Sequence, residues 1–275
     1  MILLNERSVP HYNGMTVADA ARIVDDEADI FIVNGFPVPL STVIEDGDKC
    51  WIWKRGKIPS SDEIRHLLYA RHTPGVQERL SGSIVGIMGL GGLGSTVALA
   101  LARMGVGRLL LCDFDVVEPT NLNRQQYFVD QIGMKKVDSL REIICKVNPA
   151  VHVSCIDKRL SEESIALDFA GVDALVECFD DPASKAAGLR AALLHLPGTY
   201  YVCSSGLAGY GDNNTIKTRL LYPGVYMVGD GVSAASPGEG LMAARVGIAA
   251  HHQANQVVRL LLGVEEEEGL CEDCL

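Results

Sequence analysis

IVGIMGLGGLGS, at residues 84–95, reads as a buried strand, a glycine hairpin and the start of a helix. Its glycines at 89, 91 and 94 fit the pattern G-x-G-x-x-G. In that pattern the first glycine permits a tight turn, the second lets the backbone approach a phosphate, and the third lets the helix pack on the strand. We expect Ser95 to start a helix over residues 96–102, whose positive end favours an anion. Taken alone, the motif is typical of a nicotinamide dehydrogenase.

The residues that follow favour a different nucleotide. The next apolar run, at residues 109–115, closes with two acids, and Asp113 is at the spacing of a ribose-binding carboxylate. Cations come next, among them Arg124 and Lys136. A guanidinium binds phosphate oxygens as a fork and an ammonium acts as a compact point charge. A redox cofactor has no evident use for these groups, whereas the triphosphate of ATP does.

Five motifs occur in order between Gly89 and Pro149: G-x-G-G-L-G-S, D-F-D, N-L-x-R-Q, a Gly-x-x-Lys turn and N-P. With them the chain resembles the ThiF/MoeB/HesA superfamily, the bacterial relatives of ubiquitin-activating enzymes. Residues 229–255 are most similar to ThiF family 2. The resemblance implies a Rossmann-like, doubly wound, mostly parallel α/β sheet, which the alternation of strand and helix patterns also predicts. It implies an ATP site formed by Gly89, Gly91, Gly92, Gly94, Asp113, Asp115, Asn121, Arg124 and Lys136.

The resemblance also suggests a metal ligand and a second subunit. Asp180 falls where the superfamily places an acid that binds magnesium near the phosphates, although Asp180 and Asp181 could equally cap a helix before Pro182. Arg65, on a helix predicted over residues 63–70, falls where relatives place an arginine that reaches the ATP of a partner subunit. Arg71 competes for that role, and an ordinary surface charge is the alternative for both. The implied assembly is a homodimer, with Arg65, Arg124, Lys136 and Asp180 as catalytic residues.

Residues 1–57 lie outside the Rossmann pattern. They read as strands around an amphipathic helix capped by Thr16, and they resemble the β-grasp fold of the sulfur carrier ThiS, most closely in I-x-V-N-G-x-x-V-P. A working carrier ends in a free Gly-Gly carboxylate, whereas this module continues through Arg55-Gly56-Lys57. It is therefore a structural remnant or a docking or regulatory module, not the substrate. We expect a linker at residues 58–62 and an ATP-binding adenylyltransferase domain at residues 63–275.

Composition narrows the class of partner. The chain has 275 residues, a net charge of -11 and a sequence pI near 5.1, which argues against sequence-independent nucleic-acid binding. It has no apolar run long enough to span a membrane and no signal-like start, so we expect a cytoplasmic protein without a membrane partner. The eight cysteines are expected to be reduced.

The cysteines give little support for a metal. A terminal C-x-x-C, Cys271 and Cys274, supplies half of a tetrahedral zinc site, and the alternatives are a redox pair or an unstructured tail. The first C-x-x-C of many relatives is missing. Cys203 is the least implausible cysteine for a covalent link to a carrier, and that role stays open.

The favoured function is adenylation of the C-terminal glycine carboxylate of a small β-grasp sulfur carrier ending in Gly-Gly, with ThiS of thiamine biosynthesis as the expected partner and ATP with Mg²⁺ as cofactors. The alternatives are adenylation of a molybdopterin carrier, a peptide C-terminus or a tRNA base, a non-catalytic carrier-binding scaffold, and a dehydrogenase.

Overall fold

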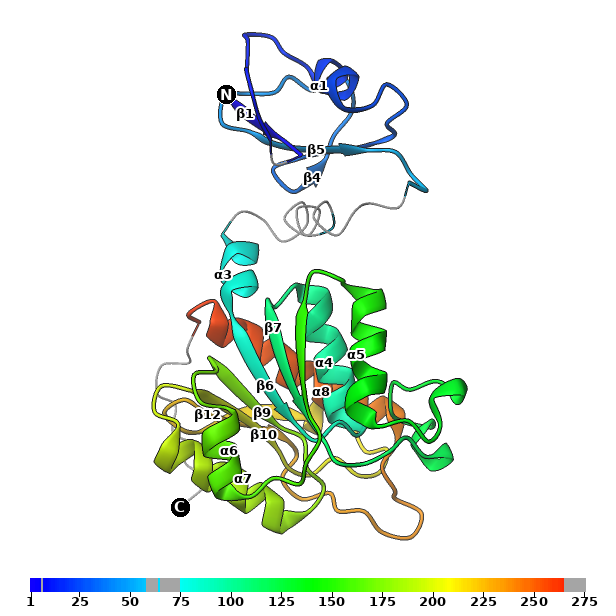
Figure 1. The fold of residues 1–275 in the computed structure, drawn as a ribbon, viewed down its shortest axis with the longest axis vertical. Coiled ribbons are helices and arrows are strands. Elements are labelled where there is room, and N and C mark those ends of the chain that lie inside the picture. Colours follow the sequence, from blue (N-terminus) through cyan, green and yellow to red (C-terminus); the bar gives the residue numbers. More distant parts are fainter. Residues whose placement is uncertain (6, 58–63, 65–74, 265–275) are drawn as a thin grey trace. The chain divides into compact units, whose positions relative to one another are not determined.

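The computed structural model describes residues 1–5, 7–57, 64 and 75–264 (Figure 1). The chain divides into two compact units, Met1–Arg79 and Leu80–Leu275. The predicted linker at residues 58–62 and most of the helix predicted over residues 63–70 lie outside the described residues. The domain boundaries given above therefore stay predictions.

The first unit holds a five-stranded sheet in the order β2-β1-β5-β3-β4. α1 caps one side of its core, which includes Ile2, Leu4, Val17 and Ile52. The predicted Thr16 cap is confirmed as a capping box: the Thr16 hydroxyl accepts from the Asp19 amide, and the Asp19 carboxylate accepts from the Thr16 amide. The elements are β1 (Ile2–Leu4), β2 (Arg7–Val9), α1 (Val17–Val24), β3 (Ile30–Val33), β4 (Phe36–Pro37) and β5 (Lys49–Trp53).

The second unit is built on a seven-stranded sheet in the order β11-β12-β10-β9-β6-β7-β8. All neighbouring strands pair in parallel except β11, which is antiparallel to β12. The predicted doubly wound, mostly parallel sheet is confirmed. The strands are β6 (Ile84–Met88), β7 (Arg108–Cys112), β8 (His152–Ile156), β9 (Ala174–Glu177), β10 (Tyr200–Ser204), β11 (Lys217–Tyr222) and β12 (Val225–Gly229).

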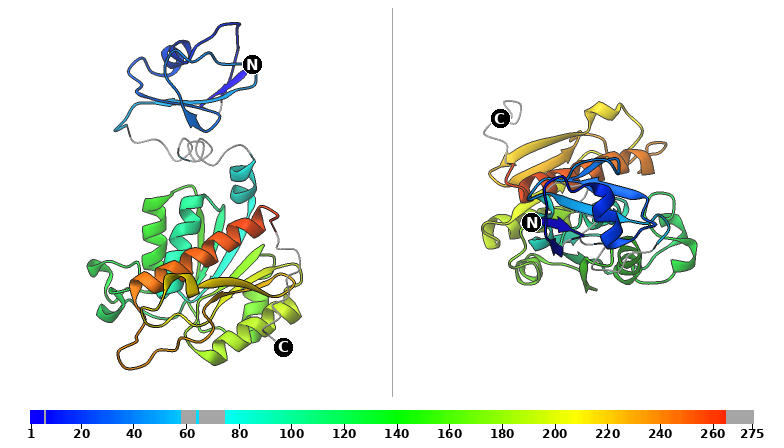
Figure 2. Two further views of the ribbon diagram at one scale, coloured as in Figure 1. Left: turned by 180° about the vertical axis from the view of Figure 1, so that it is seen from behind. Right: turned by 90° about the horizontal axis from the view of Figure 1, so that it is seen from above.

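Helices cover both faces of this sheet. α4 packs against α5 and α8 on one face, and α6 packs against α7 on the other (Figures 1 and 2). The apolar strands are buried between the two layers, as in other parallel sheets. The helices are α3 (Val76–Gly82), α4 (Gly92–Met104), α5 (Lys136–Val147), α6 (Glu162–Asp168), α7 (Pro182–His195) and α8 (Ala243–Leu261). Among the described residues no helix is long and apolar enough to cross a membrane.

The glycine turn between β6 and α4 is sterically obligatory. A Cβ on Gly94 would lie 1.9 Å from the carbonyl oxygen of Gly89, and Gly89 itself has a φ of +84°. The prediction that Ser95 starts the helix was wrong, because α4 begins at Gly92 with Gly91 as its N-cap. Ser95 lies in the first turn, where its hydroxyl donates to the Gly91 carbonyl. The reason is tertiary: Gly92 and Gly94 are helical despite their low propensity, because α4 packs against α5 and α8.

Candidate active site

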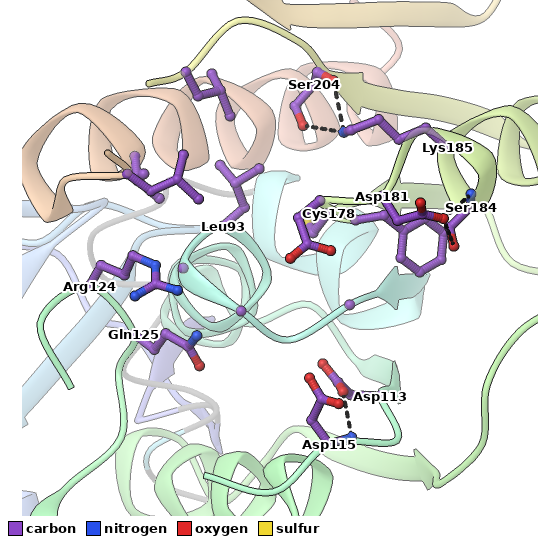
Figure 3. Close-up of a pocket in the computed structure, with 18 of the residues that line it drawn as sticks. Leu93, Asp113, Asp115, Arg124, Gln125, Cys178, Asp181, Ser184, Lys185 and Ser204 are labelled. Atoms are coloured by element: carbon purple, nitrogen blue, oxygen red, sulfur yellow. Dashed lines mark hydrogen bonds between the residues drawn. The ribbon is translucent and has the colours of Figure 1, made fainter. Parts of the chain in front are cut away.

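A cavity of about 560 Å³ opens at the carboxyl ends of β6, β7, β9 and β10 (Figure 3). The direction of the strand order reverses between β6 and β9, and such a point is where open α/β sheets bind ligands. The volume is in the range of small-molecule sites. The lining contains five cations and four carboxylates: Arg124, Lys136, Lys158, Arg159 and Lys185, with Asp113, Asp115, Asp180 and Asp181.

The glycine turn forms one wall of this cavity and leaves room beside its backbone. A Cβ on Gly91 would meet nothing closer than the Gln125 side-chain nitrogen at 3.8 Å. A Cβ on Gly92 would be 3.0 Å from Val246 of α8. Gly91 thus offers open backbone at the start of α4, whose first amides lack partners within the helix. This arrangement suits an anionic group of a ligand.

Two carboxylates that follow β7 and one lysine at the start of α5 lie beside the glycine turn. Asp113 is buried and accepts hydrogen bonds from the amides of Leu90 (2.7 Å) and Asp115 (2.8 Å). The Lys136 ammonium donates to Asp115 at 2.7 Å and lies 3.9 Å from Asp113. Each carboxylate oxygen can accept a second hydrogen bond, so Asp113 keeps capacity for a ribose hydroxyl. The structure therefore brings together three residues predicted for the ATP site.

The loop after β7 supplies a further predicted pair. Asn121 is buried and stabilises the loop, because its side-chain oxygen accepts a hydrogen bond from the Glu118 amide at 3.0 Å. Its carbonyl accepts from the amides of Arg124 (3.1 Å) and Gln125 (2.9 Å). Asn121 thus helps to position Arg124. The Gln125 Oε1 atom is buried without a hydrogen-bond partner in the described part of the chain, and Gln125 lines the cavity.

Asp180 and Asp181 separate into two roles. Asp181 caps α7, because its carboxylate accepts from the amide and the hydroxyl of Ser184, both at 2.8 Å. These hydrogen bonds lower the pKa of Asp181. Asp180 is exposed, lines the cavity, and makes no hydrogen bond or ion pair with any residue described in the structure. The capping alternative therefore applies to Asp181 and leaves the Asp180 carboxylate available.

A buried pair on the other side of the cavity was not predicted as a site. Glu177 is 1% exposed at the end of β9, and Lys185 of α7 donates to both its carboxylate oxygens, at 2.9 and 3.1 Å. Burial raises the pKa of Glu177, and Lys185 opposes that rise. Lys185 and Ser204 lie across the cavity from Asp113 and Asp115 (Figure 3).

Two more cations, Lys158 and Arg159, follow β8 and were not predicted as site residues. Lys158 forms an ion pair with Asp168 at 2.5 Å. The guanidinium of Arg159 lies over the ring of Phe114, 5.6 Å from its centroid, which is within the range of a cation–π contact. Lys158, Arg159 and Phe114 all line the cavity. No motif marks residues 158 and 159, so only the fold reveals their position.

Four of the predicted residues cannot be placed in the site. Arg65, Arg71, Cys271 and Cys274 lie outside the described residues. Among those that are described, no group of three or more His, Cys, Asp or Glu is arranged to hold a metal ion. Burial raises the pKa of Cys203 to about 12, which keeps its thiol protonated and gives no support for a nucleophilic role.

Comparison with known proteins gives two family matches. A model of the ThiF family matches residues 64–272, and a model of ThiS-like ubiquitin matches residues 1–56. The sulfur carrier protein ThiS adenylyltransferase of Escherichia coli is 31% identical over 202 residues, which are 70% of this chain and 78% of that protein.

Other relatives match over shorter shares of their length. The adenylyltransferase and sulfurtransferase UBA4 of Yarrowia lipolytica is 32% identical over 66% of this chain, and the molybdopterin-synthase adenylyltransferase of Salmonella typhimurium is 37% identical over 38% of it. The chain spans 46% and 43% of the length of these two relatives. The tRNA threonylcarbamoyladenosine dehydratase TcdA of E. coli, solved with AMP, shares the fold with a TM-score of 0.64 at 22% identity, covering 72% of this chain and 93% of TcdA.

Proposed function

We propose that this chain, which belongs to the ThiF family, transfers AMP from ATP to the C-terminal carboxylate of a small ubiquitin-like sulfur carrier. In its most specific form, the carrier is ThiS and the pathway is thiamine synthesis. The relative named for ThiS matches over most of its own length, which supports ThiS over the molybdopterin carrier. A homodimer in which Arg65 reaches the partner subunit's ATP completes the proposal.

The proposed reaction needs positioning rather than a general base. One oxygen of the carrier carboxylate attacks the α-phosphorus of ATP and forms an acyl–phosphate bond. The bond from the α-phosphorus to the oxygen that bridges to the β-phosphate breaks, and its electrons leave with pyrophosphate. The carboxylate is already ionised at pH 7, so no proton has to be removed. Catalysis then consists of in-line alignment and neutralisation of the charge on the leaving pyrophosphate.

Different residues around the cavity would perform the two tasks of alignment and charge neutralisation. The open backbone at Gly91 and the start of α4 would bind phosphate oxygens. Arg124, held by the carbonyl of Thr120 and the side chain of Asn123, would neutralise the polyphosphate. Asp113 would bind the ribose, and Lys136, whose ammonium is paired with Asp115 and lies near Asp113, would face the nucleotide.

The donor set at Asp180 fits magnesium. The Asp180 carboxylate has no partner among the described residues and lines a cavity that would hold a triphosphate. Mg²⁺ commonly occupies such sites, with one or two carboxylates and the substrate phosphates as ligands. When bound there, the ion would neutralise charge on the phosphate oxygens. The single observation that carries the whole proposal is that the glycine turn, Asp113, Arg124, Lys136 and Asp180 line one cavity.

The test is exchange of labelled pyrophosphate into ATP in the presence of a carrier ending in Gly-Gly. Asp180→Asn should lower the exchange rate at least about a hundredfold, since it removes a charge at the phosphates and breaks no contact within the protein. Asp130→Asn, which neutralises an exposed carboxylate away from the cavity, is the matched control and should exchange at the wild-type rate. Full exchange by the Asp180 variant would reject the magnesium role, and absence of exchange by wild-type protein would reject adenylation.

A further inference from the structure

The ammonium of Lys185 has more acceptors than it can satisfy. It lies 2.9 and 3.1 Å from the two carboxylate oxygens of Glu177, 3.0 Å from the carbonyl oxygen of Ser204 and 3.3 Å from the Ser204 hydroxyl. An ammonium has three N–H donors, so one of these four contacts is always weak. The longest and most easily replaced contact is the one to the Ser204 hydroxyl.

The Glu177 carboxylate fixes the position of this ammonium. Its oxygens also accept from the Phe179 amide at 2.6 Å and approach the Ser204 amide at 3.5 Å. Behind it, the Gln253 side chain of α8 donates to the Glu177 carbonyl at 3.0 Å. Three elements, β9, β10 and α8, therefore hold the buried acid rigidly, while the Lys185 side chain is 29% exposed on the cavity side.

Lys185 lines the same cavity as the residues proposed to bind ATP. The loop after β10 and the segment before α8 also contribute to this lining. Six of their lining residues are small: Ser205, Gly206, Ala208, Ser233, Ala234 and Ala235. Leu207 and Leu241 line the cavity from the same two segments. Small side chains leave room for the end of a polypeptide chain, whose charged terminus would need a cation such as Lys185.

We propose that Lys185 binds the substrate carboxylate that is adenylated, with a carboxylate oxygen replacing the Ser204 hydroxyl on its ammonium. The inference rests on the proposed function and assigns the carboxylate-recognising cation within it. Lys185 stays bonded to Glu177 throughout, so the acid acts as a fixed support and the lysine as the catalytic residue that touches the substrate. Arg124 and Lys136 remain with the nucleotide.

A purely structural role for Lys185 makes a different prediction, and one variant separates the two. Removing Lys185 alone leaves the buried charge of Glu177 unpaired, which destabilises the protein whatever else the lysine does. The double variant Glu177→Gln/Lys185→Met removes both charges and keeps similar volumes. If Lys185 served only to neutralise Glu177, this variant would recover wild-type substrate recognition.

The experiment measures recognition of the carboxylate charge directly. E. coli ThiS is prepared with its C-terminal carboxylate or with a carboxamide in its place, and the binding of each form to the full-length protein is measured by calorimetry with a non-hydrolysable ATP analogue. Wild-type protein should bind the carboxylate form at least about tenfold more tightly, in line with a charged hydrogen bond. The double variant should bind both forms equally. Lys146→Met, which removes an exposed charge on α5, should keep the wild-type ratio.

The outcomes distinguish this inference from the proposed function. If wild-type protein catalyses pyrophosphate exchange with ThiS but the double variant still prefers the carboxylate form tenfold, the role of Lys185 is wrong and adenylation stands. If wild-type protein shows neither exchange nor a preference for the carboxylate form, both are wrong. A folded double variant is verified by unchanged affinity for ATP, since neither Glu177 nor Lys185 is among the residues proposed to bind ATP.

Discussion

The two units of the molecule differ in the chain segment that follows a central strand, β5 in the first unit and β6 in the second. After β5 of the β-grasp unit, the chain is basic, and its charges pair back onto the segment between α1 and β3: Lys57 with Asp25 at 3.7 Å, Arg55 with Asp29 at 3.9 Å, and Lys54 with Glu27. After β6 of the second unit, the chain turns on glycines and leaves backbone donors facing a cavity. Both strand ends are polar, but only the second keeps binding capacity for another molecule.

This contrast separates stability from function within one chain. In the first unit, ion pairs between exposed groups satisfy the strand end and contribute little energy. In the second unit, the Gln125 Oε1 atom and the Asp180 carboxylate line the cavity and have no hydrogen-bond partner among the described residues.

Gly94→Ala should have the largest effect, because its Cβ would collide with the backbone of Gly89 at 1.9 Å. We expect a loss of at least about 3 kcal/mol in the free energy of unfolding of the second unit, since overpacking against backbone cannot relax cheaply, and loss of ATP binding. Gly247→Ala in α8 is the control: nothing lies within 4 Å of its Cβ, so stability should rise by about 0.5–1 kcal/mol. Urea unfolding followed by circular dichroism measures both. Unchanged unfolding of Gly94→Ala would mean that the turn is not rigid.

Removing the buried ion pair of Asp230 and Arg245, whose atoms are 2.7 Å apart, should have the next largest effect on the free energy of unfolding. Although burial opposes its charge, hydrogen bonds from Ser233, Val232 and Arg245 lower the pKa of Asp230 from 3.8 to about 2. A lowered pKa stabilises the folded state above the unfolded pKa, so this contribution of about 2 kcal/mol is present above pH 4 and disappears as the pH falls toward 2.

Asp230→Asn should therefore flatten the pH dependence of unfolding of the second unit between pH 4 and 2 and lower its stability at pH 6. Lys54→Met, which breaks an exposed ion pair in the first unit, should change stability by less than about 0.5 kcal/mol. Equal effects of the two substitutions would contradict the distinction between the units.

Thr16→Ala should have the smallest effect and should stay within the β-grasp unit. It removes the capping box of α1 and should cost that unit about 1 kcal/mol. Both tryptophans of the chain, Trp51 and Trp53, belong to this unit, so intrinsic fluorescence reports its unfolding alone. The affinity for ATP should be unchanged. A parallel loss of ATP affinity would show that the two units are energetically coupled.

The sequence predicted the parts of the site that depend on strand order. The strands that precede Gly89, Asp113 and Asp180 are parallel neighbours, so their carboxyl ends meet at one edge of the sheet, and a motif or a spacing marked each residue. It could not predict Lys185 or Arg159. Their place in the cavity depends on the direction of a side chain from α7 and on the path of the loop after β8, and no local pattern encodes either.

The start of α4 shows the same limit at the level of the backbone. Gly92 and Gly94 have poor helix propensity, so the local sequence favours a helix that begins at Ser95. Val246 and the Arg124 loop, both distant in sequence, lie against Gly92 and hold it in place. Helix boundaries fixed by such contacts are visible only in the folded chain.

The continuation of β5 through Lys54 and Lys57 also fixes a stoichiometry. Because the two units share one polypeptide, each unit that carries the glycine-turn cavity is synthesised with one β-grasp unit, and the ratio cannot vary with expression.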